Sequence, residues 1–74
     1  MRGDIERFSS GWSQINLRLR KNEIDAIVAA LRRLSADSHF HLRATFDDSS
    51  SKNGIADIEV SLQGDEEVDN LTLE

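Results

Sequence analysis

The feature that most constrains the fold is a change in the spacing of apolar residues along the chain. Apolar and polar residues alternate over residues 13–20, apolar residues recur at helical spacing over 22–35, and alternation returns over 39–46 and 55–63. Alternation is typical of a half-buried strand, and a 3.6-residue period is typical of an amphipathic helix. The sequence therefore predicts the order strand–helix–strand–strand.

The predicted helix has the clearest pattern of the four elements. Its apolar residues fall at i, i+3, i+4, i+7 and i+10, on one helix face; they are Ile24, Ile27, Val28, Leu31 and Leu34. Asn22 is the predicted N-cap, because its side-chain oxygen can accept a backbone N–H that has no partner within the helix. Acidic residues in the first turn and arginines in the last turn interact favourably with the helix dipole.

These elements predict an α+β domain of two layers, with one amphipathic helix on a mixed sheet of three to four strands. The helix returns the chain across the sheet, so strands 13–20 and 39–46 are expected to be parallel and strand 55–63 antiparallel to both. If strand 13–20 lies beside strand 55–63, Arg18 and Arg20 face Asp57 and Glu59.

We expect residues 1–74 to form a single domain, with an N-terminal arm over 1–12, a core over 13–63 and a tail over 64–74. In the arm, Ile5, Phe8 and Trp12 have spacings of three and four, which fit either one helical turn or an irregular segment. Trp12 is either packed at the core edge or an interface anchor. The tail is either a short edge strand over about residues 69–73 or a disordered acidic segment.

The polar segment 47–54, "DDSSSKNG", connects the last two predicted strands. Asn53-Gly54 is a typical two-residue hairpin turn. A turn of only these two residues would place the inward Phe46 opposite the outward Ser61, which the alternation of strand side chains forbids. A longer loop or a bulged hairpin is therefore expected.

Composition narrows the classes of function. The chain has no cysteine, so a disulfide framework and a thiolate metal site are excluded. No apolar stretch approaches the roughly 20 residues of a membrane span, and we expect a cytoplasmic, bacterial protein without membrane contact. Residues 1–33 hold seven Lys or Arg and four Asp or Glu, a charge balance of +3. Residues 34–74 hold two Lys or Arg and ten Asp or Glu, a charge balance of −8. The acidic balance disfavours nucleic-acid binding. Either the two halves pair with each other within one fold, or the acidic half forms a surface that attracts a basic protein.

Two histidines one residue apart, His39 and His41, are the main candidates for chemistry. They lie on one face of the predicted strand 39–46, within reach of a single metal ion, and Asp57 or Glu59 of a neighbouring strand could add a ligand. The alternatives are the outward half of an ordinary alternating strand and a pH-responsive binding face. No cofactor is predicted. No catalytic residues are predicted either, because nothing in the sequence indicates a pocket with an acid–base pair.

Four segments together resemble small immunity proteins of bacterial polymorphic toxin systems. They are "INLRLRKNEIDAIVAALRRL", "HFHLRATF", "GIADIEVSL" and "DNLTL", within roughly residues 15–73. The resemblance implies an α+β fold and a non-enzymatic protein that binds a cognate toxin domain and blocks it. It assigns no individual residue to the binding site.

The leading prediction is thus a non-enzymatic protein-binding module, an immunity protein that contacts a basic toxin domain through an acidic surface. The candidate partner-binding residues are Asp47, Asp48, Asp57, Glu59, Asp65, Glu66, Glu67 and Asp69. One alternative is a homo-oligomeric structural or regulatory module, such as a homodimer. A second alternative is a metal- or ligand-binding domain centred on His39 and His41.

Overall fold

A computed structural model describes residues 1–45 and 54–74. Four strands and two helices occur in these ranges: β1 (Arg2–Arg7), β2 (Ser13–Arg18), α1 (Lys21–Arg32), α2 (Leu34–Asp37), β3 (His39–Arg43) and β4 (Asp57–Ser61). The α+β class is confirmed. Neither described helix has the length and apolar character needed to cross a membrane.

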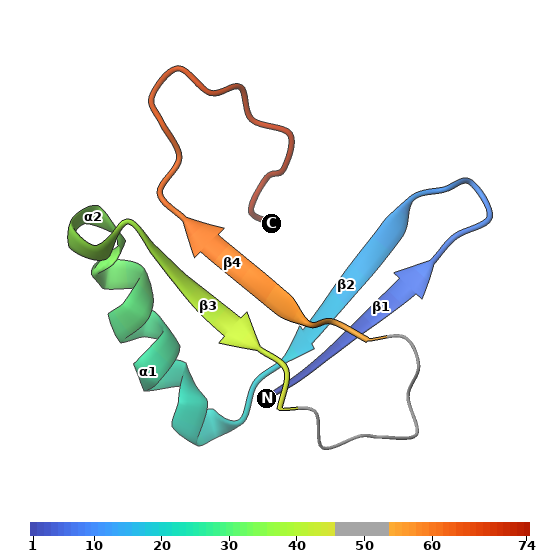
Figure 1. The fold of residues 1–74 in the computed structure, drawn as a ribbon, viewed down its shortest axis with the longest axis horizontal. Helices are drawn as coiled ribbons and strands as arrows, with labels where there is room; N and C mark the ends of the chain where they lie inside the picture. Colours follow the sequence, from blue (N-terminus) through green and yellow to red (C-terminus); the bar gives the residue numbers. More distant parts are fainter. Residues whose placement is uncertain (46–53) are drawn as a thin grey trace.

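The strands form two separate antiparallel hairpins, β1–β2 and β3–β4, with no parallel pair between β2 and β3 among the described residues. Figure 1 shows the hairpins meeting near the N-terminus and diverging from there, with α1 beside β3. The single mixed sheet expected from the sequence is thus divided into two hairpins. The strand total of four agrees with the upper expectation, but the fourth strand precedes β2 instead of following β4.

The N-terminal arm is therefore a strand and a turn, not a helical turn or an irregular segment. The Phe8 N–H donates to the carbonyl oxygen of Trp12 at 2.9 Å, and the Gly11 N–H donates to that of Phe8 at 3.1 Å. Gly11 has φ +95°, a backbone conformation that glycine adopts without steric cost. The three- and four-residue spacings of the apolar residues arise because the chain reverses between Phe8 and Trp12.

The first hairpin is amphipathic. Its register pairs Ile5 with Ile15 and Gly3 with Leu17, which places these residues on one face. On the other face Arg18 donates to Asp4 at 3.2 Å. Arg18 therefore pairs within its own hairpin, and the pairing with Asp57 or Glu59 expected from a shared sheet is wrong.

Helix α1 begins two residues earlier than the predicted N-cap Asn22 implies, because Arg20 is the N-cap. Glu23 explains the shift, because its carboxylate accepts the Arg20 backbone N–H at 2.9 Å and lies 2.8 Å from the amine of Met1. The pKa of Glu23 is held below its usual range, first by the hydrogen bond from the N-terminal amine and then by the one from Arg20. Glu23 thus connects the beginning of β1 to the beginning of α1.

After α1 and the single turn α2, Ser38 adopts the left-handed conformation with φ 67° and donates its N–H to Leu34 at 2.8 Å. This residue ends the helical segment and directs the chain into β3. In the second hairpin Phe40 lies opposite Val60 and Leu42 opposite Ile58, and all four are half-buried. They form the apolar face of this hairpin, and α1 lies beside β3 (Figure 1).

The register of the second hairpin continues to Ala44, whose N–H donates to Ala56 at 3.0 Å. This register pairs inward residues with inward residues, as the alternation of strand side chains requires, and the turn predicted around Asn53-Gly54 falls on a segment that lies largely outside the described residues. Phe46, Asp47, Asp48 and Asn53 lie outside the described residues. No strand is present in the tail over residues 64–74, so the short edge strand expected there is wrong.

Candidate functional site

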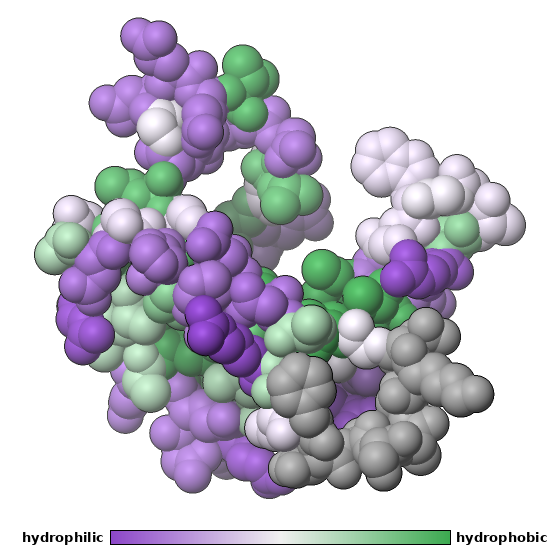
Figure 2. Space-filling view, viewed as in Figure 1, coloured by the Kyte–Doolittle hydropathy of each residue, from purple (hydrophilic) through white to green (hydrophobic). Residues whose placement is uncertain are grey.

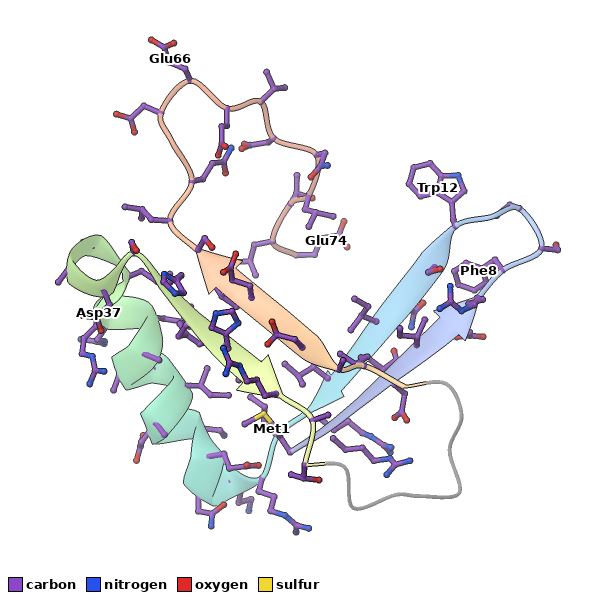
Figure 3. The ribbon with its side chains drawn as sticks, viewed as in Figure 1. Met1, Phe8, Trp12, Asp37, Glu66 and Glu74 are labelled. Atoms are coloured by element: carbon purple, nitrogen blue, oxygen red, sulfur yellow. The ribbon has the colours of Figure 1, made fainter. Side chains whose placement is uncertain are left out.

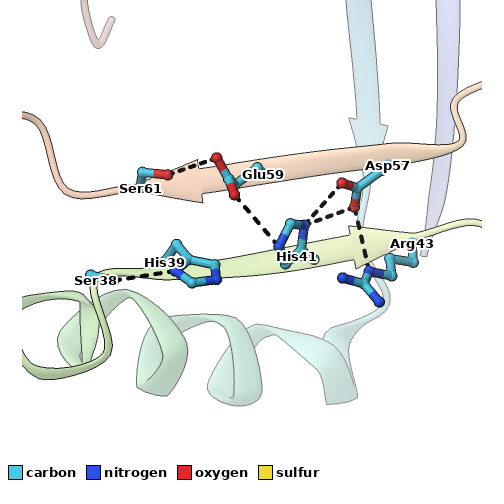
Figure 4. Close-up of polar contacts among 7 residues, drawn as sticks. All are labelled: Ser38, His39, His41, Arg43, Asp57, Glu59 and Ser61. Atoms are coloured by element: carbon cyan, nitrogen blue, oxygen red, sulfur yellow. Dashed lines mark hydrogen bonds and ion pairs between the residues drawn. The ribbon is translucent and has the colours of Figure 1, made fainter.

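The polar face of the second hairpin brings the two histidines together with two of the predicted acidic residues. The register places His41 opposite Glu59 and Arg43 opposite Asp57. Alternation along β3 and β4 directs their apolar neighbours to the helix side, so these polar side chains share the opposite face. Figure 4 shows them in a row above α1.

His41 lies between two carboxylates. Its Nδ1 is 2.9 Å from Oδ2 and 3.0 Å from Oδ1 of Asp57. Its Nε2 is 3.5 Å from Oε1 of Glu59. The imidazole is half-buried, whereas both carboxylates are exposed. Asp57 is thus placed to orient the ring by accepting a hydrogen bond from Nδ1–H, and Nε2 is then the nitrogen that faces Glu59.

His39 joins this cluster from the neighbouring outward position of β3. Its ring makes an edge-on contact with the His41 ring at a centroid distance of 5.3 Å, and its Nδ1 is 3.2 Å from Oγ of Ser38. One ligand atom each from His39, His41 and Glu59 lie within 4.8 Å of one another. Two imidazoles and one carboxylate are a donor set that suits zinc and related divalent metals.

The row of polar side chains on β3 and β4 continues beyond the histidines. Arg43 Nε is 3.8 Å from Oδ1 of Asp57, and the Ser61 hydroxyl donates to Oε2 of Glu59 at 3.1 Å. Asp57 and Glu59, predicted as partner-binding residues, therefore each contact side chains of their own hairpin. Asp57 has a cationic partner in Arg43, and both carboxylates face the ring of His41.

The acidic residues of the tail lie apart from this row. Gln63 donates to Oδ1 of Asp69 at 2.8 Å, and the Gly64 N–H donates to the Glu67 carboxylate at 3.0 Å. These bonds fold the tail into a turn, and Figure 3 shows Glu66 at its far end. The predicted acidic surface is thus divided between the β4 face and the tail, and Asp47 and Asp48 lie outside the described residues.

Exposed apolar residues are a second candidate contact region, which the sequence interpretation assigned to the core. No side chain in residues 1–45 and 54–74 is buried. We call the following set the open apolar residues: Ile5, Ile15 and Leu17 of the first hairpin and Ile24, Val28 and Leu31 of α1. Figure 2 shows hydrophobic side chains at the inner side of the angle between the hairpins.

Helix α1 covers only part of its apolar face. Ile27 and Ala30 are half-buried, whereas the other large apolar residues of α1, Ile24, Val28 and Leu31, are exposed. Trp12, at the tip of the first hairpin, is 78% exposed (Figure 3). The amphipathic stripe of α1 was visible in the sequence, but a single-chain pattern does not distinguish a face covered by the same chain from one left open.

The dimensions of the molecule agree with this exposure. Its radius of gyration is 14.4 Å, whereas a compact domain of this length has about 11 Å. Its accessible surface is 7063 Å², whereas a compact monomer of this mass has about 4,600 Å². The chain thus exposes roughly 2,500 Å² more surface than a compact monomer.

Comparison of the chain with protein-family models, with curated proteins and with solved structures gives no match.

Proposed function

We propose that this chain is a non-enzymatic protein-binding module in which a second copy covers the open apolar residues and the acidic residues contact a basic protein partner. The observation that carries the proposal is the absence of any buried side chain in the described residues of a 74-residue chain. Burial of apolar surface is the main favourable term in folding, so a chain that leaves this surface open requires another chain to cover it.

The amount of exposed surface supports a second copy as the occupant. An obligate homodimer buries about 2,000–5,000 Å² in total, or about 1,000–2,500 Å² from each chain. The excess of roughly 2,500 Å² over a compact monomer lies at the upper end of that range. A second copy is also present whenever the chain is made, whereas a different partner must be encountered.

The charge distribution supports the same arrangement. The balance of +3 over residues 1–33 and −8 over residues 34–74 would be brought together if the N-terminal half of one copy lay against the C-terminal half of the other. A two-fold axis forms each such contact twice. Charge complementarity of this kind fixes register and accelerates association.

For the second contact we propose the role of an immunity protein that neutralises a basic toxin domain in the bacterial cytoplasm. The resemblance of four chain segments to immunity proteins and the exposed acids of the tail support it. Asp65 and Glu66 are exposed, at the turn that the tail forms around Gln63. Acidic residues on such a turn attract a basic surface over a distance set by salt, about 8 Å at physiological ionic strength.

Affinity capture from a lysate of the native host tests this role. The tagged protein is expected to retain a basic protein at low salt and to lose it at high salt. The purified pair should then bind directly, and binding should inhibit the activity of the captured protein. The variant Asp65→Lys/Glu66→Lys should weaken binding at least about tenfold through charge reversal.

The matched control is Glu6→Lys/Asp25→Lys, which reverses two exposed charges of the N-terminal half and should bind normally. Equal loss in both variants would show that net charge, not the tail, determines binding. Capture of nothing except the protein itself would contradict the immunity role and favour the alternative of a homo-oligomeric structural or regulatory module.

A further inference from the structure

We propose that His39, His41 and Glu59 form a binding site for a divalent transition metal of the zinc class, which joins β3 to β4. Two ligands come from β3 and one from β4, at positions fixed by the hairpin register. The site does not depend on the binding role proposed above, because all three ligands belong to one hairpin of one chain.

The distances fit a single ion. Ligand bonds to zinc are about 2.0–2.1 Å, so two ligands of a tetrahedral ion are roughly 3.3–3.4 Å apart. His41 Nε2 and Glu59 Oε1 are 3.5 Å apart. The full set of three ligand atoms lies within 4.8 Å, and His39 and Glu59 are exposed side chains that can turn inward.

Oxygen atoms that can hold each histidine ring in place lie beside its Nδ1 atom. Asp57 accepts from Nδ1 of His41, and Ser38 lies beside Nδ1 of His39. A metal-binding histidine usually donates its other ring N–H to an oxygen in this way, which fixes the tautomer and the ring orientation. When Nδ1 of His41 carries the proton, the lone pair of Nε2 faces the Glu59 carboxylate, and a cation between them relieves that repulsion.

The donor set selects the class of metal. Imidazole nitrogens favour Zn²⁺, Ni²⁺, Co²⁺ and Cu²⁺, whereas Mg²⁺ and Ca²⁺ prefer oxygen ligands alone. Three protein ligands leave a fourth position for water. A metal at this place would restrain the hairpin of a chain that has little core of its own, as structural metals do in other small domains.

The test uses the full chain without a polyhistidine tag, freed of metal by chelator treatment and then titrated with Zn²⁺. We expect one Zn²⁺ per chain by competition with a chromophoric chelator, and a thermal unfolding midpoint that rises with Zn²⁺ but not with Mg²⁺. Binding of Co²⁺ should give the visible absorption of a tetrahedral site with nitrogen and oxygen ligands.

Variants assign the ligands. His39→Ala/His41→Ala should weaken Zn²⁺ binding by more than about 100-fold. Asp57→Asn should weaken it by about 10- to 100-fold, because the Asp57 carboxylate orients the His41 ring. Glu59→Gln should also weaken it, whereas Glu66→Gln, the same change on an exposed tail residue, should not. Circular dichroism of each metal-free variant establishes that it is folded.

Two results would overturn the proposal. One is a wild-type chain that binds no Zn²⁺ up to millimolar concentration, in which case His41 is part of an ordinary cross-strand ion pair. The other is a double histidine variant that is folded and binds Zn²⁺ as tightly as the wild type. Single variants such as His39→Gln decide the matter if the double variant does not fold.

Discussion

At the scale of single residues, Glu23 has the most specific role of the charged side chains. It fixes the first residue of α1 and ties the helix to the N-terminal amine. Because its pKa is lowered in the folded chain, its contribution to stability is present above the pKa of the unfolded chain, about 4.3, and is lost as the pH falls through the folded value.

Glu23→Gln is therefore expected to lower the unfolding midpoint temperature at pH 7, with a difference from the wild type that is smaller at pH 3, below the unfolded pKa. Thermal unfolding followed by circular dichroism at the two pH values measures this. Asp25→Asn removes another carboxylate of α1, two residues further along the helix and exposed, and should have little effect at either pH. A Glu23→Gln difference that is equal at pH 3 and pH 7 would contradict the ionic role.

Ser38 is the second residue with a particular backbone role. A left-handed conformation costs a residue other than glycine roughly 1–2 kcal/mol, and Ser38 has φ 67°. Ser38→Gly should raise the free energy of unfolding of the metal-free chain by about 0.5–1 kcal/mol, as measured by urea denaturation. Ser35→Gly, within the helical turn α2, should instead lower it by up to about 1 kcal/mol. Destabilisation by both changes would rule out strain at Ser38.

At the scale of elements, the sequence predicted the strands that carry several apolar residues and missed the one that does not. β2, β3 and β4 have alternating apolar side chains, whereas β1 has only Ile5 as a large apolar residue. β1 is a strand because it pairs with β2, and the informative signal was the turn segment Ser9–Gly11 between two extended runs. Pairing partners are a tertiary property, so alternation alone does not separate one mixed sheet from two hairpins.

The candidate site shows the same division between local and tertiary information. Alternation placed His39 and His41 on one face and proposed Asp57 or Glu59 as neighbours, and the β3–β4 register brings all four together. The separation of the tail acids from this face was not predictable, because it depends on the turn that Gln63 and Glu67 stabilise.

The packing of α1 on the second hairpin predicts unequal costs for two leucine truncations. Leu42 is half-buried on β3, the strand that lies beside α1 in Figure 1, so Leu42→Ala should lower the free energy of unfolding by about 1–2 kcal/mol. Leu73 is 101% exposed in the tail, and Leu73→Ala should change it by less than about 0.5 kcal/mol. Similar costs in urea denaturation would mean that the tail packs elsewhere or that the helix does not cover β3.

At the scale of the whole molecule, the chain has secondary structure and half-buried apolar side chains but no buried side chain among its described residues. The first hairpin exposes Ile5, Ile15 and Leu17 on one face. On its other face polar side chains pair with one another, as Arg18 does with Asp4. Amphipathic hairpins of two strands have marginal stability unless their apolar face is covered. In the proposed dimer, a second copy of the chain supplies that cover.

The two faces of this hairpin provide a matched pair of variants. Ile15→Lys should convert the dimer to a monomer at micromolar concentration, because a charge would be placed in the covered face. Gln14→Lys changes the neighbouring residue of β2, which lies on the opposite, polar face, and should leave the dimer intact. Size-exclusion chromatography with light scattering measures both masses, and a dimer in both variants would place the interface elsewhere.

The most direct test of the proposed dimer is sedimentation equilibrium of the wild-type chain over a range of concentrations, combined with thermal unfolding of the same samples. We expect the mass of two chains at micromolar concentration and an unfolding midpoint that rises with protein concentration, because folding and association are then coupled. A single-chain mass with a cooperative unfolding midpoint that is independent of concentration would contradict the dimer.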